Sequence, residues 1–176
     1  MINPEYNILN RTLLLVKDLA AVNTFVASEN EAVQPVSPTA VQLWKVVEGT
    51  QLTQGSPGVT NLLMPGILVT PMVVETSSQG GLNCADDEKV RVAIQIVDNN
   101  PHTQNSVIRT YGDWLIAIRN RLTVLPTPFQ QDADQTKYDP WLVNILRRVP
   151  ADARRLLQTE QTVAMMVFEV QVRHHR

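Results

Sequence analysis

Few residues in this chain have the types and spacing that catalysis needs. Cys84 is the single cysteine, and it could act as a nucleophile only beside a base. His102 is the only histidine away from the C-terminus, and it lies in an Asn-Pro-His-Thr sequence typical of a turn. No Gly-x-Ser-x-Gly nucleophile elbow occurs. We therefore predict no catalytic residue, with a small cytosolic enzyme that uses Cys84 or His102 as an alternative.

Metal and phosphate sites are also not indicated. Asp132 and Asp134 begin like a calcium loop, but Lys137 replaces the glycine at the sixth position. The acidic run Asp86-Asp87-Glu88 precedes a predicted strand and is interpreted as solvated charge, and His174 and His175 are adjacent residues that would face opposite sides. The glycines of residues 55–58 lack the lysine of a phosphate loop. We expect no metal ion and no cofactor.

The tryptophans leave one more alternative open. Trp44, Trp114 or Trp141 could line the pocket of a ligand-binding module. In patterns of this kind, however, tryptophan more often belongs to the core.

Charge is sparse and unevenly placed. Charged residues make up 18% of the 176, where about 25% is usual, and the net charge is −2. Residues 1–100 are mainly acidic and residues 101–176 mainly basic, with Arg147-Arg148 and Arg154-Arg155 as the densest basic pairs. No nucleic-acid-binding motif accompanies these arginines. The simplest interpretation is that these arginines are solvated on the surface. The more specific alternative is a contact between copies of the chain, acidic patch against basic patch.

The elements that must position these residues alternate between helix and strand patterns. Apolar residues at spacings of three and four predict a helix over residues 4–27, begun by Pro4. Strands are predicted at 41–47, 67–75 and 90–97, the last with clear apolar alternation. Polar loops are expected at 49–61 and 76–88.

The second half adds a helix at 105–123, stopped by Pro126, and a closing strand at 166–172. Asp139-Pro140 resembles a helix N-cap and first position, so we predict a short helix to about 148. The resulting fold class is α+β: a single domain over residues 1–176, with one mostly antiparallel sheet flanked by two main helices and with long polar loops. No signal peptide or transmembrane segment is expected, because the uncharged stretch 49–74 is rich in Pro and Gly.

Three segments carry a family resemblance. They are the strand Val90–Val97, the helical run Tyr111–Arg119 and the closing strand Met166–Val172, after a long N-terminal helix. In this order they resemble the tail terminator (tail completion) proteins of tailed bacteriophages and, more distantly, the cap proteins of contractile injection systems. A head–tail connector or adaptor is the alternative within structural proteins.

The resemblance implies a non-enzymatic virion subunit that forms a homohexameric ring at the end of the tail tube. Such a ring stops tube polymerisation and offers a surface to the head–tail connector. The implied partners are copies of the chain, the tail tube and possibly sheath proteins, and the neck proteins. DNA would pass through the lumen without specific binding, no membrane would be involved, and assembly would occur in the host cytoplasm. The candidate residues for subunit contacts or the lumen wall are Arg119, Arg121, Arg147, Arg148, Arg154 and Arg155, and the loops at 49–61 and 76–88 are candidate inter-subunit arms.

Overall fold

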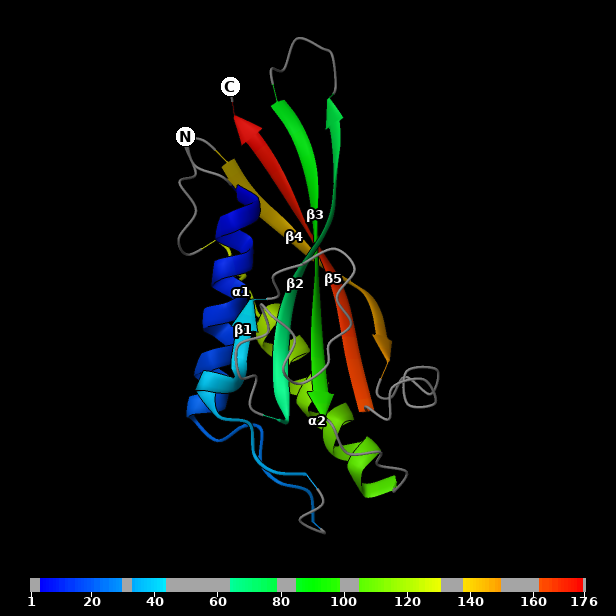
Figure 1. Ribbon diagram of the computed structural model, residues 1–176. Helices are drawn as coiled ribbons and strands as arrows, with labels where there is room; N and C mark the ends of the chain where they lie inside the picture. The colour runs from blue at the N-terminus through cyan, green and yellow to red at the C-terminus, as the bar shows by residue number, and fades with distance from the viewer. Residues whose placement is uncertain are drawn as a thin grey trace, which may run out of the picture.

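The computed structural model describes residues 4–29, 33–43, 64–78, 85–98, 105–130, 138–149 and 162–175. These residues form two long helices, one short 3₁₀ helix and one five-stranded sheet (Figure 1). The elements in chain order are α1 (Pro4–Ala21), η1 (Pro38–Ala40), β1 (Val41–Leu43), β2 (Gly66–Ser78), β3 (Ala85–Asp98), α2 (Asn105–Leu122), β4 (Tyr138–Val149) and β5 (Thr162–His175). The predicted α+β class is confirmed.

The sheet has the strand order β1-β2-β3-β5-β4. Only β1 and β2 run parallel, and the other three pairs are antiparallel. β3 and β5 form the centre, where Val90, Val92, Ile94 and Ile96 alternate with more polar residues as the sequence predicted. A mostly antiparallel sheet is therefore confirmed.

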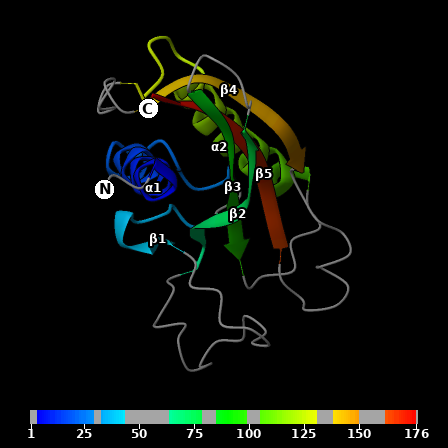
Figure 2. The same cartoon turned by 90° about the horizontal axis from the view of Figure 1, so that it is seen from above.

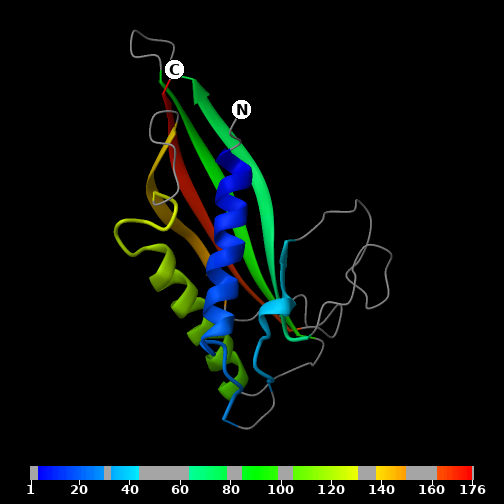
Figure 3. The ribbon, with the colours of Figure 1, turned by 90° about the vertical axis from the view of Figure 1, so that its left-hand side faces the viewer.

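Both helices cover the same face of the sheet, as Figures 2 and 3 show from two directions. We call this the inner face and the opposite one the outer face. One continuous core joins the apolar stripes of α1 and α2 to the inner-facing residues of β2, β3 and β5. From α2 it takes Val107, Tyr111, Trp114, Leu115, Ile118 and Leu122, at the spacing that one buried helix face requires.

α1 ends six residues earlier than predicted. Asn23 has a φ of 57°, the left-handed conformation that asparagine tolerates after a helix end. The Thr24 amide donates a hydrogen bond back to the Leu19 carbonyl oxygen, which closes the last turn. Val22 and Val26, which the periodicity assigned to the apolar stripe, are exposed as a result.

The predicted short helix at 140–148 is wrong, because these residues belong to β4. β4 pairs antiparallel with β5, and its register shifts twice, between Pro140 and Leu142 and between Ile145 and Arg147. Two bulges in twelve residues break the alternation that marks a strand in sequence. Pro140 is accommodated because β4 is at an edge of the sheet.

The predicted polar loop at 76–88 is wrong at both ends. Residues as far as Ser78 belong to β2, and residues from Ala85 onward belong to β3. This end of the sheet extends beyond the helices in Figure 1, so it has no apolar core to cover. The loop predicted at 49–61 lies outside the described residues, as do residues 79–84.

Candidate interaction surface

The predicted arginines come from two elements. Arg119 and Arg121 occupy the last turn of α2, where positive charge suits the helix dipole, and both are exposed. Arg147 and Arg148 are exposed near the end of β4. Within the described ranges, none of the four forms an ion pair with a carboxylate. Arg154 and Arg155 lie outside those ranges.

β4 presents a long open edge. It is the last strand in the sheet order, and in the part of the chain that the structure describes no strand pairs with its other side. Its two bulges coincide with exposed apolar side chains, Trp141 at 43% and Leu146 at 47%. An edge strand with unpaired amides and carbonyls can accept a strand from another chain.

A second exposed apolar feature follows α2. Val124 is exposed, and Leu125 is 82% exposed, the most exposed large apolar side chain among the described residues. We call these two residues the knob. The sequence pattern did not single them out, although an apolar pair after the end of a helical stripe and before Pro126 is a recognisable signal.

The chain immediately after the knob is held in place. Phe129 is buried and stacks on Phe168 of β5, with ring centroids 6.1 Å apart. The Arg11 Nε of α1 donates a hydrogen bond to the Pro128 carbonyl oxygen at 3.1 Å. The Thr127 amide donates to the Gln130 Oε1 at 3.0 Å. The knob is thus presented from a fixed segment.

Beside the knob lies a groove along α1. It consists of two adjoining hollows of about 170 and 50 Å³ that share Arg11 and Leu14. The first hollow is also lined by Phe129 and Pro140, and the second by Asp18, Arg121 and Val124. Leu14 is itself exposed on α1. We call these hollows together the groove.

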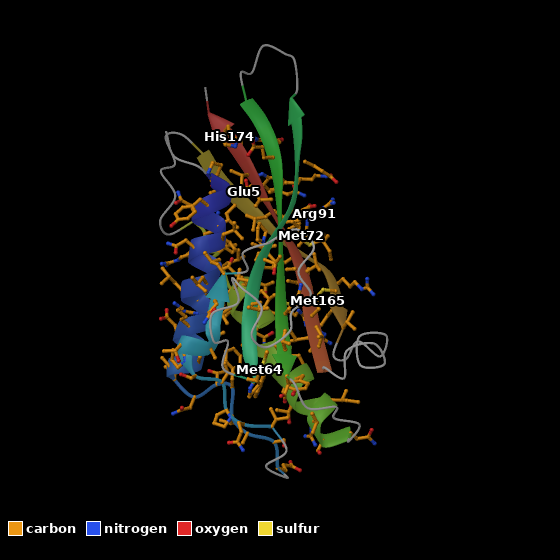
Figure 4. All side chains as sticks on the ribbon, in the orientation of Figure 1. Glu5, Met64, Met72, Arg91, Met165 and His174 are labelled. Carbon is orange, nitrogen blue, oxygen red and sulfur yellow. The ribbon has the colours of Figure 1, made fainter. Side chains whose placement is uncertain are left out.

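The outer face of the sheet carries a charged cluster. The Arg91 guanidinium contacts Glu75 at 2.8 Å and Glu169 at 3.0 Å. Glu169 is only 4% exposed, and the Gln171 side-chain amide also donates to it. The hydrogen bond to Glu169 raises the pKa of Arg91 above its usual value. Figure 4 labels Arg91 with Met64, Met72 and Met165, three methionines on and beside the same sheet.

The acidic run at residues 86–88 serves cross-strand pairing. Arg173 of β5 donates to Asp87 at 2.9 Å, and this hydrogen bond lowers the pKa of Asp87. The His174 Nε2 lies 2.9 Å from Glu88, in an orientation that does not make a hydrogen bond. The carboxylates of Asp87 and Glu88 therefore each face a basic group of β5 instead of a second carboxylate.

A buried polar pair joins α2 to the end of β3. The Tyr111 hydroxyl donates a hydrogen bond to the Asp98 carboxylate at 2.8 Å, and both residues are buried. Burial, followed by the nearby Asp98 charge, raises the pKa of Tyr111 well above its usual value. This pair was not predicted from the sequence, because the apolar pattern of the strand and of the helix does not show which polar residues meet between them.

The surroundings of Trp114 bear on the alternative that the chain is a ligand-binding module. It borders a pocket of about 470 Å³ between the segment after α1 and the first turns of α2. However, the side chain is only 2% exposed and packs edge-on against Tyr111 at 5.5 Å. Among the described residues, its buried Nε1 finds no hydrogen-bond partner. Trp114 is thus a core residue whose edge reaches a pocket wall, and Trp141 is on the open edge of β4.

The other predicted candidates are not placed. Cys84, His102, Asp132, Asp134 and Trp44 all lie outside the described residues. Within the described ranges, no group of three or more His, Cys, Asp or Glu could hold a metal ion. Neither described helix has the length and apolar character needed to cross a membrane. No protein-family model matches the chain, and no curated protein is significantly similar to it.

Proposed function

We propose that this chain is a non-enzymatic structural subunit that assembles with copies of itself into a ring, in the manner of phage tail terminator proteins. The ring would sit at the end of a tail tube, block further addition of tube subunits and present its other side to the neck proteins. Its mechanism would be steric coverage of a growing end.

The open edge of β4 carries this proposal. A subunit that joins a neighbour side by side needs a surface with both hydrogen-bonding and apolar groups. β4 offers twelve residues of edge strand, two exposed apolar side chains and the arginines Arg147 and Arg148. In Figures 1 and 2, α1 and the end of β4 lie on opposite sides of the molecule. Contacts between opposite sides of successive subunits are the kind that close into rings.

The order of elements supports the more specific assignment to a tail terminator. A long first helix, a mostly antiparallel sheet and a second helix before the last strands are what the resemblance led us to expect. A head–tail connector subunit would share the same ring and differ in the partners that it meets.

Charge reversal on β4 tests the role of this edge. We expect Arg147→Glu with Arg148→Glu to abolish ring formation, measured by size-exclusion chromatography with light scattering. Both side chains are exposed, so the variant should remain folded by circular dichroism. The matched control is Arg147→Lys with Arg148→Lys, which keeps the charge and should keep the ring. An oligomer unchanged by the double glutamate variant would contradict the proposal.

A further inference from the structure

The knob and the groove form one patch on the surface of the molecule. Val124 is part of the knob and also lines the groove, and Pro126 after the knob lines it too. Leu14 lies between the two hollows of the groove, exposed on α1. Figure 3 shows the chain after α2 beside α1 and the first part of β4. The knob thus borders the groove, and both have an exposed apolar side chain.

The patch also contains charges of both signs, with Arg11 at both hollows and held by its hydrogen bond to Pro128. Asp18 and Arg121 line the same hollow and are both exposed. In the described part of the chain they form no ion pair with each other or with another residue. An acid and a base that remain apart within one copy can each meet the opposite charge of a second copy.

The knob is suited to binding because it is already held in one conformation. Leu125 has 82% of its surface exposed, while Thr127 and Phe129 close behind it are buried. Ordering an interface side chain and its loop costs free energy on binding, and a fixed segment avoids much of that cost. Exposed apolar side chains that lie together, as Leu14, Val124 and Leu125 do here, are typical of an interaction surface.

We propose that this patch binds the same patch of a second copy of the chain about a two-fold axis. A two-fold contact requires a surface that is complementary to itself, with residue i meeting residue j and j meeting i. In this contact the Leu125 of each copy enters the groove of the other and packs on Leu14. Asp18 of each copy lies opposite Arg121 of the other, which fixes the register of the contact.

The contact goes beyond the ring, since it requires only two copies and does not involve Arg147 or Arg148 of β4. It implies that copies of the chain associate in pairs. Because a two-fold axis turns the two copies in opposite directions, the pairs join subunits of two different rings, and such an assembly holds an even number of copies.

Cysteine cross-linking tests the geometry. In a Cys84→Ser background, one preparation carries Leu14→Cys and a second carries Leu125→Cys. We expect a mixed disulfide between the two preparations to form at least tenfold faster than either disulfide within a single preparation. The matched control replaces Leu14→Cys by Val22→Cys in the mixture, because Val22 is 71% exposed but lies outside the patch. Equal rates for the mixture and the control would overturn the proposal.

A charge swap tests the register. We expect Asp18→Arg or Arg121→Asp alone to weaken dimerisation at least tenfold, measured by sedimentation equilibrium. The double variant should restore it, because the two charges then meet in reversed order. A double variant as weak as either single variant would contradict the pairing of Asp18 with Arg121.

A further pair of variants separates this contact from the ring. The glutamate variants of Arg147 and Arg148 should leave the cross-link unchanged, and Leu125→Asp should abolish the dimer even in those variants.

Discussion

At the residue scale, buried polar groups join α2 to the sheet and β3 to β5. Asp98 at the end of β3 accepts a hydrogen bond from Tyr111 of α2, thirteen residues later in the chain. Glu169 of β5 meets Arg91 of β3 on the outer face. Neither pair was predictable, because a sequence shows which residues are polar but not which strand registers will bring them together.

Removal of the Tyr111 hydroxyl should reveal the strength of the first pair. We expect Tyr111→Phe to lower the free energy of unfolding by about 1–3 kcal/mol, because a buried carboxylate loses a donor. Urea denaturation measures this. The control is Tyr6→Phe on the exposed side of α1, which should change the value by less than about 0.5 kcal/mol.

The same variant predicts a pH dependence. Tyrosine in the unfolded chain ionises near pH 10, whereas burial keeps Tyr111 neutral in the folded protein. The raised pKa therefore contributes stability below pH 10 that is lost as the pH rises further. We expect the stability advantage of the wild type over Tyr111→Phe to shrink between about pH 10 and 11. A constant difference in the free energy of unfolding between the two proteins across that range would show that the Tyr111 hydroxyl is not shielded from solvent.

Arg91 and Arg109 allow an ion pair with a buried carboxylate to be compared with an exposed ion pair. Arg91→Leu leaves the buried Glu169 without its cation and should lower the free energy of unfolding far more than Arg109→Leu does. Arg109→Leu breaks only an exposed contact with Asp113 at 3.9 Å and should cost less than about 0.5 kcal/mol. Guanidinium denaturation of both variants measures the difference, and similar losses would contradict the role of Glu169.

At the element scale, the parts of the chain with a regular apolar period were predicted correctly and the others were not. Apolar and more polar residues alternate in β3 because one face of the strand packs against the helices. α2 has a regular apolar stripe because one side of the helix packs against the sheet. β4 was taken for a helix because Asp139-Pro140 imitates a helix start and two bulges disturb the alternation. The end of β2 and the start of β3 were taken for a loop because their residues are mostly polar. The start of β3 is held to β5 by the ion pair of Asp87 with Arg173 in place of apolar contacts.

Gly112 gives a test of α2 as an element. It lies inside the helix, and a Cβ added there would meet no atom within 4 Å. Glycine weakens a helix interior by roughly 0.5–1 kcal/mol relative to alanine. We therefore expect Gly112→Ala to raise the free energy of unfolding by about that amount. Thermal unfolding measures the change, and a lowered midpoint would indicate a packing role for this glycine.

At the scale of the whole molecule, the low charge content agrees with a subunit that contacts neighbours. Charged residues are depleted at the cores of interfaces. The prediction that partners bury the region around 49–74 stays a prediction, because most of that region lies outside the described residues. The exposed apolar groups that the structure does place, Leu14, Leu125, Trp141 and Leu146, come from α1, the segment after α2 and β4. Among the residues of these candidate surfaces, the arginines Arg121, Arg147 and Arg148 were predicted from the sequence, whereas the exposed apolar groups became visible only in the folded structure.

Native mass measurement of the unmodified chain tests self-assembly most directly. The account predicts a defined oligomer with an even number of copies. For a hexameric ring, six copies of the 19.7 kDa chain give about 118 kDa. Two such rings joined by the two-fold contact would give about 236 kDa. A species of 19.7 kDa alone, at every concentration that the protein tolerates, would contradict both the ring and the two-fold contact.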